Sequence, residues 1–189
     1  MLRHLRALVL LLALPCAGVA AQDTRDLSEE ARKQYATGIR EASALVRENR
    51  YADADARLDA LLAQRPREPQ ARFLKGVVAT EQGRTDAAMA VFLALIEDYP
   101  ELPEPYNNLA VLYAQKGDYN GARVALETAI RSAPDWPVAR ENLGDIYVRL
   151  AGVEYERAAK LDAGNKTAPA KLVIVRDLLA PGAAAKPKS

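Results

Sequence analysis

Residues 103–136 read PEPYNNLAVLYAQKGDYNGARVALETAIRSAPDW, and the 34 residues before them, 69–102, read PQARFLKGVVATEQGRTDAAMAVFLALIEDYPEL. The two stretches agree in the kind of residue at many positions, and the agreement extends beyond them. Residues of one kind recur at intervals of 34: Pro66, Pro100 and Pro134; Ala54, Ala88 and Ala122; Leu58, Phe92 and Leu126; Asn49, Gly83 and Gly117; Gly76, Ala110 and Gly144. Several registers with one period indicate a chain built from stacked structural repeats.

Each period predicts a pair of helices. Residues 69–82 and 103–116 carry apolar side chains at helical spacing behind a proline, which a helix accepts in its first turn. Gly83 and Gly117 follow them, and glycine readily adopts the left-handed backbone that ends a helix. A second helix is expected after each glycine, over 85–98 in the first case, until the next proline stops it. The repeating unit is therefore an antiparallel helix pair.

At these positions the chain resembles the tetratricopeptide repeat family. The third period carries the fullest match, through Tyr106, Leu109, Ala110, Tyr113, Gly117, Tyr119, Ala122, Leu126, Ala129 and Pro134. The resemblance covers about residues 35–162 and implies an all-α solenoid of helix-turn-helix units. It places three regular repeats at 35–68, 69–102 and 103–136, of which the first is the loosest match, as terminal repeats often are.

The fourth period departs from the pattern. Tyr147 precedes Ala151 by four residues where Tyr113 precedes Ala122 by nine, so the turn is missing and residues 137–162 form a truncated repeat. Apolar residues at helical spacing predict one long helix over 137–161, with a short tight hairpin as the alternative. The residues of that stripe are Leu143, Tyr147, Leu150, Ala158 and Leu161.

The residues that follow predict a helix and a tail. We expect a capping helix within 166–180, with Leu172, Val175, Leu178 and Leu179 on the face that covers the last groove. Residues 181–189 are rich in Pro, Gly, Ala and Lys and are expected to be a disordered tail.

The first residues have the layout of a secretory signal peptide. Arg3 and Arg6 precede an apolar run that is interrupted by Pro15 and is too short to span a bilayer, and small residues follow. We therefore predict a signal peptide over 1–20, with cleavage after Ala20 or Ala21, and a lead-in over 21–34. Together with the repeats, the leader favours an exported bacterial protein of the periplasm, without stable membrane insertion after cleavage.

The composition excludes several kinds of chemistry. The chain has 26 basic and 25 acidic residues, a balance that argues against nucleic acid as its partner. His4 and Cys16 are the only histidine and cysteine, and both lie in the predicted leader. The processed chain therefore lacks a catalytic triad, a cysteine nucleophile and the zinc ligands that those residues supply. We expect no catalytic residues, no metal and no cofactor.

The resemblance also implies a binding site, because first helices line a concave groove in this family. The positions that correspond to this groove are Phe73, Leu74, Val77, Asn107, Asn108, Val111, Glu141, Asn142 and Asp145. Asn108 and Asn142 are 34 residues apart, so successive repeats are expected to present the same amide in the same orientation. A carboxamide can pair with both polar groups of an extended peptide backbone.

The sequence is compatible with three functions. The first is a non-catalytic scaffold that binds an extended peptide segment of a partner protein. The second is a self-associating structural component of an envelope assembly, which would make the chain a homo-oligomer. The third is a glycan enzyme that uses carboxylates, for which Glu141 and Asp145 are the candidates because they lie four residues apart on one helix.

Overall fold

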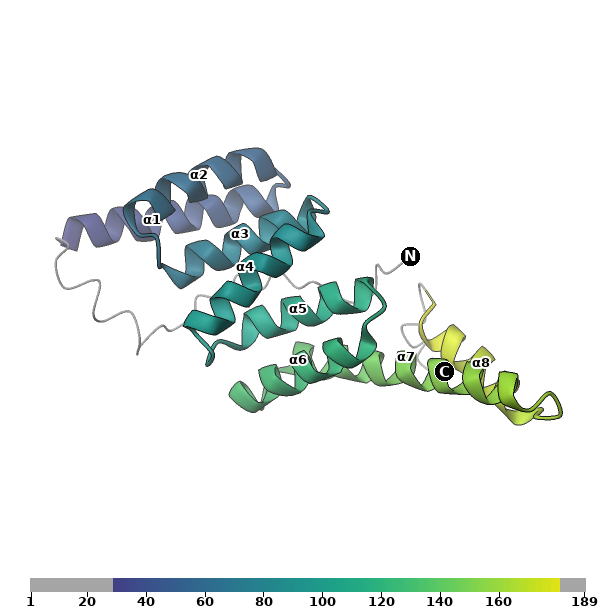
Figure 1. The fold of residues 1–189 in the computed structure, drawn as a ribbon. Coiled ribbons are helices and arrows are strands. Elements are labelled where there is room, and N and C mark those ends of the chain that lie inside the picture. The colour runs from purple at the N-terminus through teal and green to yellow at the C-terminus, as the bar shows by residue number, and fades with distance from the viewer. Residues whose placement is uncertain (1–28, 181–189) are drawn as a thin grey trace, which may run out of the picture. The chain divides into compact units, whose positions relative to one another are not determined.

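The computed structural model describes residues 29–180, and this part of the chain is all-α, as predicted. The predicted leader, the first part of the lead-in (21–28) and the tail lie outside the described residues. Figure 1 shows the helices, whose bounds are α1 Glu29–Arg47, α2 Tyr51–Gln64, α3 Pro69–Glu81, α4 Thr85–Asp98, α5 Pro103–Gln115, α6 Tyr119–Ser132, α7 Pro137–Leu161 and α8 Thr167–Leu178.

The helices divide into two compact units. The N-terminal unit contains α1 to α4 and ends at Pro100, and the C-terminal unit begins at Glu101 and contains α5 to α8. In the first unit, α1 pairs with α2 and α3 with α4, and both helices of the first pair contact α3. In the second unit, α5 packs on α6, α6 on α7 and α7 on α8. Each unit is therefore built of helix hairpins that share apolar faces.

The turns within the first three hairpins have the same geometry. Asn49, Gly83 and Gly117 have positive φ angles of 58°, 71° and 80°. The backbone N–H of the residue after each donates to a carbonyl of the preceding helix, as in Arg84 to Ala79 at 2.8 Å. This bond satisfies a carbonyl that the helix end would otherwise leave without a partner. The left-handed turns predicted at the two glycines are confirmed.

One long helix, α7, replaces the fourth hairpin, and this settles the choice between a helix and a tight hairpin. The register that holds Asn49, Gly83 and Gly117 holds Ala151 in the fourth period. Alanine has a strong helix propensity and disfavours the left-handed backbone, so the helix continues through the position where the others turn.

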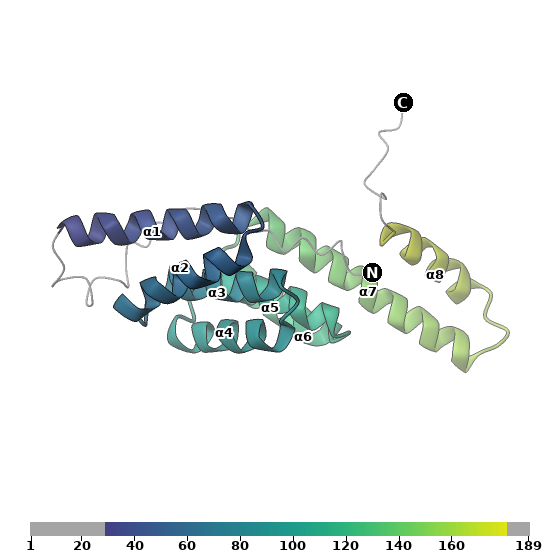
Figure 2. The same ribbon diagram turned by 90° about the horizontal axis from the view of Figure 1, so that it is seen from above.

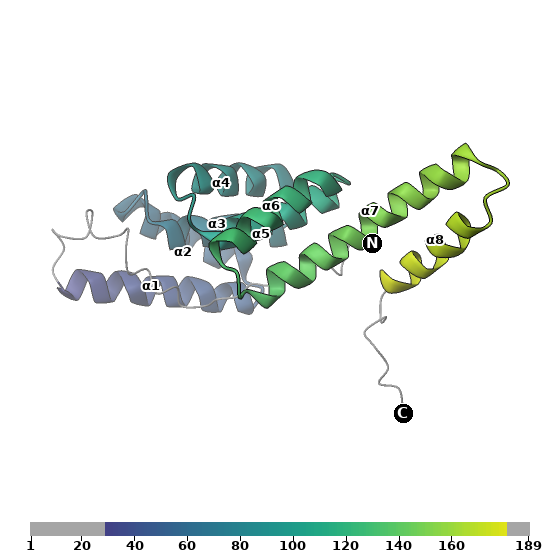
Figure 3. The same cartoon turned by 90° about the horizontal axis from the view of Figure 1, so that it is seen from below.

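The last helix, α8, runs back beside the second half of α7, as Figures 2 and 3 both show. Gly152 lies at the contact, since a Cβ placed on it would come within 3.1 Å of Val175 Cγ1. Leu172 and Val175 face α7 as expected, but Leu178, predicted on the same face, is 60% exposed. Around the axis of α8, Leu178 lies about 60° from Val175 and about 120° from Leu172. This rotation turns the side chain of Leu178 away from α7.

The apolar stripe predicted along α7 is also only partly buried. Leu143 and Leu150 pack against the apolar core of the C-terminal unit, whereas Tyr147 is 48% and Leu161 81% exposed. Other helices cover α7 only in places, so Tyr147 and the C-terminal end of the stripe remain at the surface.

Among the described helices, none combines the length and the apolar composition that a membrane span requires.

A small residue allows each pair of helices to approach closely. Gly76 on α3 shows this most clearly, since a Cβ there would lie 2.5 Å from Phe92 Cε1 on α4. Gly144 occupies the same register of the fourth period, and a Cβ there would meet nothing within 4 Å. The two glycines are thus equivalent in the repeat but opposite in their surroundings.

We expect Gly76→Ala and Gly144→Ala to change stability in opposite directions. The first overpacks the contact with Phe92 and should lower the free energy of unfolding by about 1–3 kcal/mol. The second removes a flexible residue from an open helix surface and should raise it by about 0.5–1 kcal/mol. Urea unfolding followed by circular dichroism measures both, and a loss of stability in Gly144→Ala would contradict the packing described.

Candidate functional site

The apolar residues predicted to line the groove lie mostly inside the units. Leu74 and Val77 on α3 are buried in the N-terminal unit, and Val111 on α5 is buried in the core of the C-terminal unit. Phe73 is half-buried, and its ring centroid lies 5.7 Å from that of Phe92. These side chains therefore hold helices together, and only Phe73 retains some exposed surface.

The charged side chains beside α3 pair within the N-terminal unit. Lys75 Nζ lies 2.7 Å from Oδ1 of Asp55 and 2.7 Å from Oδ1 of Asp59, both on α2. Although burial acts to lower it, these two carboxylates raise the pKa of Lys75. Arg72 pairs with Asp98 at the end of α4, and this hydrogen bond lowers the pKa of that carboxyl. These ion pairs connect α3 to α2 and α4. Because the charged groups of α3 already have partners, the polar candidates of the C-terminal unit are the better candidates for binding a ligand.

Three buried amides lie on α5 and α7 of the C-terminal unit, and we call Asn107, Asn108 and Asn142 the asparagine cluster. Asn142 Nδ2 donates to Asn107 Oδ1 at 2.9 Å, so a buried hydrogen bond joins α7 to α5. Asn107 Nδ2 is itself buried and has no hydrogen-bond partner in the described chain. The cluster therefore contains one amide N–H donor without an acceptor.

The asparagine cluster corrects the expectation that Asn108 and Asn142 present equivalent amides. Asn108 Nδ2 donates to the backbone carbonyl of Glu104, one turn earlier on its own helix, at 2.9 Å. Asn142 instead donates across to the neighbouring helix. The repeat register fixes where each Cα lies, but each buried amide turns to the acceptor within its reach.

Glu104 is a member of the site that the sequence analysis did not select. Its Oε2 is buried without a hydrogen-bond partner, and burial raises the pKa of this carboxyl above its ordinary value of 4.5. A hydrogen bond from the backbone N–H of Glu104 to its own carboxyl acts in the opposite direction. The spacing of four residues from Asn108 was the available signal, because such residues are neighbours on one helix face.

The two acidic candidates on α7 differ in exposure. Glu141 is exposed and directly precedes Asn142, whereas Asp145 is half-buried. Over residues 29–180, no group of three His, Cys, Asp or Glu side chains is placed to hold a metal ion. The buried amides are therefore the polar groups that define the site, with Asn107 Nδ2 as the unsatisfied donor.

Replacing one partner of the Asn107–Asn142 bond should cost more than replacing both. Asn142→Leu leaves the Asn107 amide buried without its partner and should lower the free energy of unfolding by about 1–3 kcal/mol. Asn107→Leu together with Asn142→Leu removes both polar groups and should restore most of this loss. A double-mutant cycle in urea measures the difference, and additive losses would show that the bond does not stabilise the unit.

The buried carboxyl predicts a dependence of stability on pH. The pKa of Glu104 is higher in the folded chain than its unfolded value of 4.5. The contribution of Glu104 to the free energy of unfolding is therefore complete below pH 4.5, and it is lost as the pH rises through the folded-state pKa. Glu104→Gln, which stays neutral, should be more stable than the unmodified chain at neutral pH and equal to it in acid. Unfolding at several pH values tests this, with exposed Glu101→Gln as the control; an equal effect of both variants would contradict it.

The comparisons with known proteins identify the repeat. Two models of the tetratricopeptide repeat match the sequence, one over residues 39–103 and the other over 79–146. Together they cover more than half of the chain. Among curated proteins, none matches this sequence.

Solved structures show the same fold at low sequence identity. A tetratricopeptide repeat protein of Thermus thermophilus, TTC0263, is 19% identical with a TM-score of 0.57, over 79% of this chain and 84% of that one. SycD of Yersinia enterocolitica, a type III secretion chaperone in complex with a peptide of the translocator YopD, is 17% identical with a TM-score of 0.56, over 70% and 98%.

The complex of Naa15/Naa10 bound to HypK-THB contains a chain that is 15% identical with a TM-score of 0.56. The match covers 77% of this chain but only 23% of that one. Identities this low show likeness of fold alone, and the family models carry the assignment. This chain belongs to the tetratricopeptide repeat family.

Proposed function

We propose that the chain is a non-catalytic scaffold that binds an extended segment of a partner protein at the asparagine cluster. Membership of a repeat family of helix hairpins supports a protein-interaction role. SycD, which has a similar fold, is known in complex with a peptide of another protein. The observation that carries the proposal is the buried amide N–H of Asn107, which has no acceptor.

The chemistry of the cluster fits a peptide backbone. A buried donor without an acceptor costs about 1–3 kcal/mol, and a carbonyl of an extended segment would recover this energy. Glu104 Oε2 is likewise buried without a hydrogen-bond partner and can accept from a backbone N–H of the same segment. Because Asn107 is 1% exposed, the side chains that cover it must rotate for a segment to bind. Capture is therefore coupled to a local rearrangement.

Photo-crosslinking tests where a partner binds. A photoreactive residue in place of exposed Glu141, beside Asn142, should form adducts with a second protein in the cell, and one in place of exposed Asn120 on α6 should not. Combining the label with Asn107→Leu and Asn142→Leu should reduce those adducts about tenfold or more, at little cost in stability. Adducts of two copies of this chain are identified by mass and scored separately. Equal labelling from both positions, or adducts that survive the double substitution, would contradict the proposal.

We also propose that the protein is exported to a bacterial periplasm. Residues 1–20 support this because they have the charged, apolar and small-residue order of a secretory leader.

If export occurs, the chain recovered from the periplasmic fraction of an expressing bacterium should begin at Ala21 or Gln22. N-terminal sequencing by mass spectrometry measures this. An intact Met1 in a chain confined to the cytoplasm would argue against export.

A further inference from the structure

One face of α7 is uncovered at a repeat position where, in the earlier hairpins, the second helix of the hairpin covers the first. Gly76 on α3 lies against Phe92 of α4, and Ala110 on α5 is buried in the core that it shares with Leu126 of α6. Gly144 holds the same register on α7, is exposed and has no side-chain neighbour within reach of a Cβ. The contact that closes the other hairpins is therefore not made at this position.

The uncovered surface extends along the helix. Gly144, Tyr147, Val148 and Ala151 lie at positions i, i+3, i+4 and i+7, which place them on one face, and we call them the Gly144 stripe. The corresponding Ala114 on α5 is fully buried, whereas Val148 is only half-buried.

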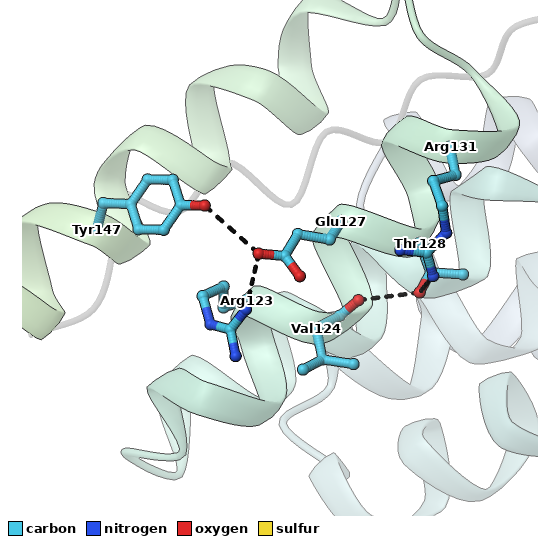
Figure 4. Close-up of polar contacts among 6 residues, drawn as sticks. All are labelled: Arg123, Val124, Glu127, Thr128, Arg131 and Tyr147. Carbon is cyan, nitrogen blue, oxygen red and sulfur yellow. Dashed lines mark hydrogen bonds and ion pairs between the residues drawn. The ribbon is translucent and has the colours of Figure 1, made fainter.

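Tyr147 is held at the edge of the Gly144 stripe. Its hydroxyl donates to Glu127 Oε1 of α6 at 3.4 Å, and Arg123 Nη1 donates to the same oxygen at 2.7 Å (Figure 4). The phenol is thus tied to α6 while the side chain as a whole remains half-exposed.

The position of α8 explains why the stripe is uncovered. Ala168, Leu172 and Val175 repeat the spacing of Ala88, Phe92 and Leu95, which are the buried residues of α4. Yet Ala168 follows Ala122 by 46 residues instead of 34. Consequently α8 packs at Gly152, about 12 Å along α7 from Gly144 at 1.5 Å per residue.

A second unpartnered apolar face lies on α8 itself. Val173, Ile174 and Leu178 are 57%, 60% and 60% exposed, so they form a part of α8 that α7 does not cover. Ala170 is also exposed and lies one turn before Ile174. Small and large residues four apart are the pattern with which α4 and α6 cover the preceding helix, as in Ala88 and Phe92. The outer face of α8 thus has the chemistry that the Gly144 stripe lacks.

We propose that the outer face of α8 in a second copy of this chain covers the Gly144 stripe, and that the contact is reciprocal. The chain's own α8 cannot do so because it is engaged at Gly152. Residues 181–189 cannot replace it because they contain no large apolar residue. In a reciprocal contact, α8 of each copy covers the Gly144 stripe of the other copy. Both apolar faces of both copies are then buried, and the pair closes as a dimer with two-fold symmetry. It does not use the asparagine cluster and is independent of the proposed function.

The first test is the oligomeric state of the chain, expressed with its leader and purified as the cell leaves it. Sedimentation equilibrium should show a dimer in the micromolar range. Gly144→Lys and Ile174→Asp each place two charges in the reciprocal contact and should raise the dissociation constant about tenfold or more. Both positions are exposed in the single chain, so thermal stability should be retained. Val124→Asp, at an exposed apolar position on α6, is the matched control and should leave the dimer intact.

Mixing the two charged variants tests whether these faces contact each other. In a pair formed from one Gly144→Lys chain and one Ile174→Asp chain, Lys faces Asp at one contact and the other contact is unmodified. The mixture should therefore dimerise although each variant alone is weakened. A monomeric unmodified chain, a dimer that neither variant weakens, or a mixture that dimerises no better than its components would each overturn the proposal.

Discussion

The close approach of two helices at a small residue is the contact on which each hairpin depends. Phe92 occupies the space that a Cβ on Gly76 would need, and Val175 lies close to the space that a Cβ on Gly152 would need. A large apolar side chain packed over a glycine buries apolar surface of both helices without leaving a gap, and the resulting dispersion contacts stabilise the pair. The same requirement explains why the small residue recurs with the period of the repeat. It also makes Gly144, where the small residue has no large partner, a meaningful exception.

Turn chemistry determines how long each helix is before this contact can form. Gly117 ends α5 through a left-handed backbone, and Asp118 then caps α6 by accepting from the backbone N–H of Gly121 at 2.8 Å. Ala151 provides no such turn, so α7 continues for 25 residues and its returning helix is displaced. Ala151 thus stands where the other hairpins have their turn residue, and the returning helix covers Gly152 instead of Gly144.

The fold could be predicted because it depends on properties that repeat, namely the prolines, the turn residues and the small positions. The site could not be predicted in the same way. The period relates Asn142 to Asn108, but the hydrogen bond joins Asn142 to Asn107, 35 residues away. Glu104 was missed because a charged residue in a first helical turn ordinarily reads as exposed, and only packing shows that its carboxyl is buried. Periodicity identifies faces of helices, whereas partner choice among buried polar groups depends on distances that the sequence does not contain.

The two proposed contacts involve opposite sides of α7. Asn142 and Gly144 are two residues apart, and residues at that spacing lie about 200° apart around a helix. Asn142 is directed inward, toward Asn107 of α5, while Gly144 is at the surface. A partner segment at the asparagine cluster and a helix on the Gly144 stripe would therefore occupy opposite sides of one helix. Binding at one side leaves the other side accessible, so a paired molecule could carry two partner segments.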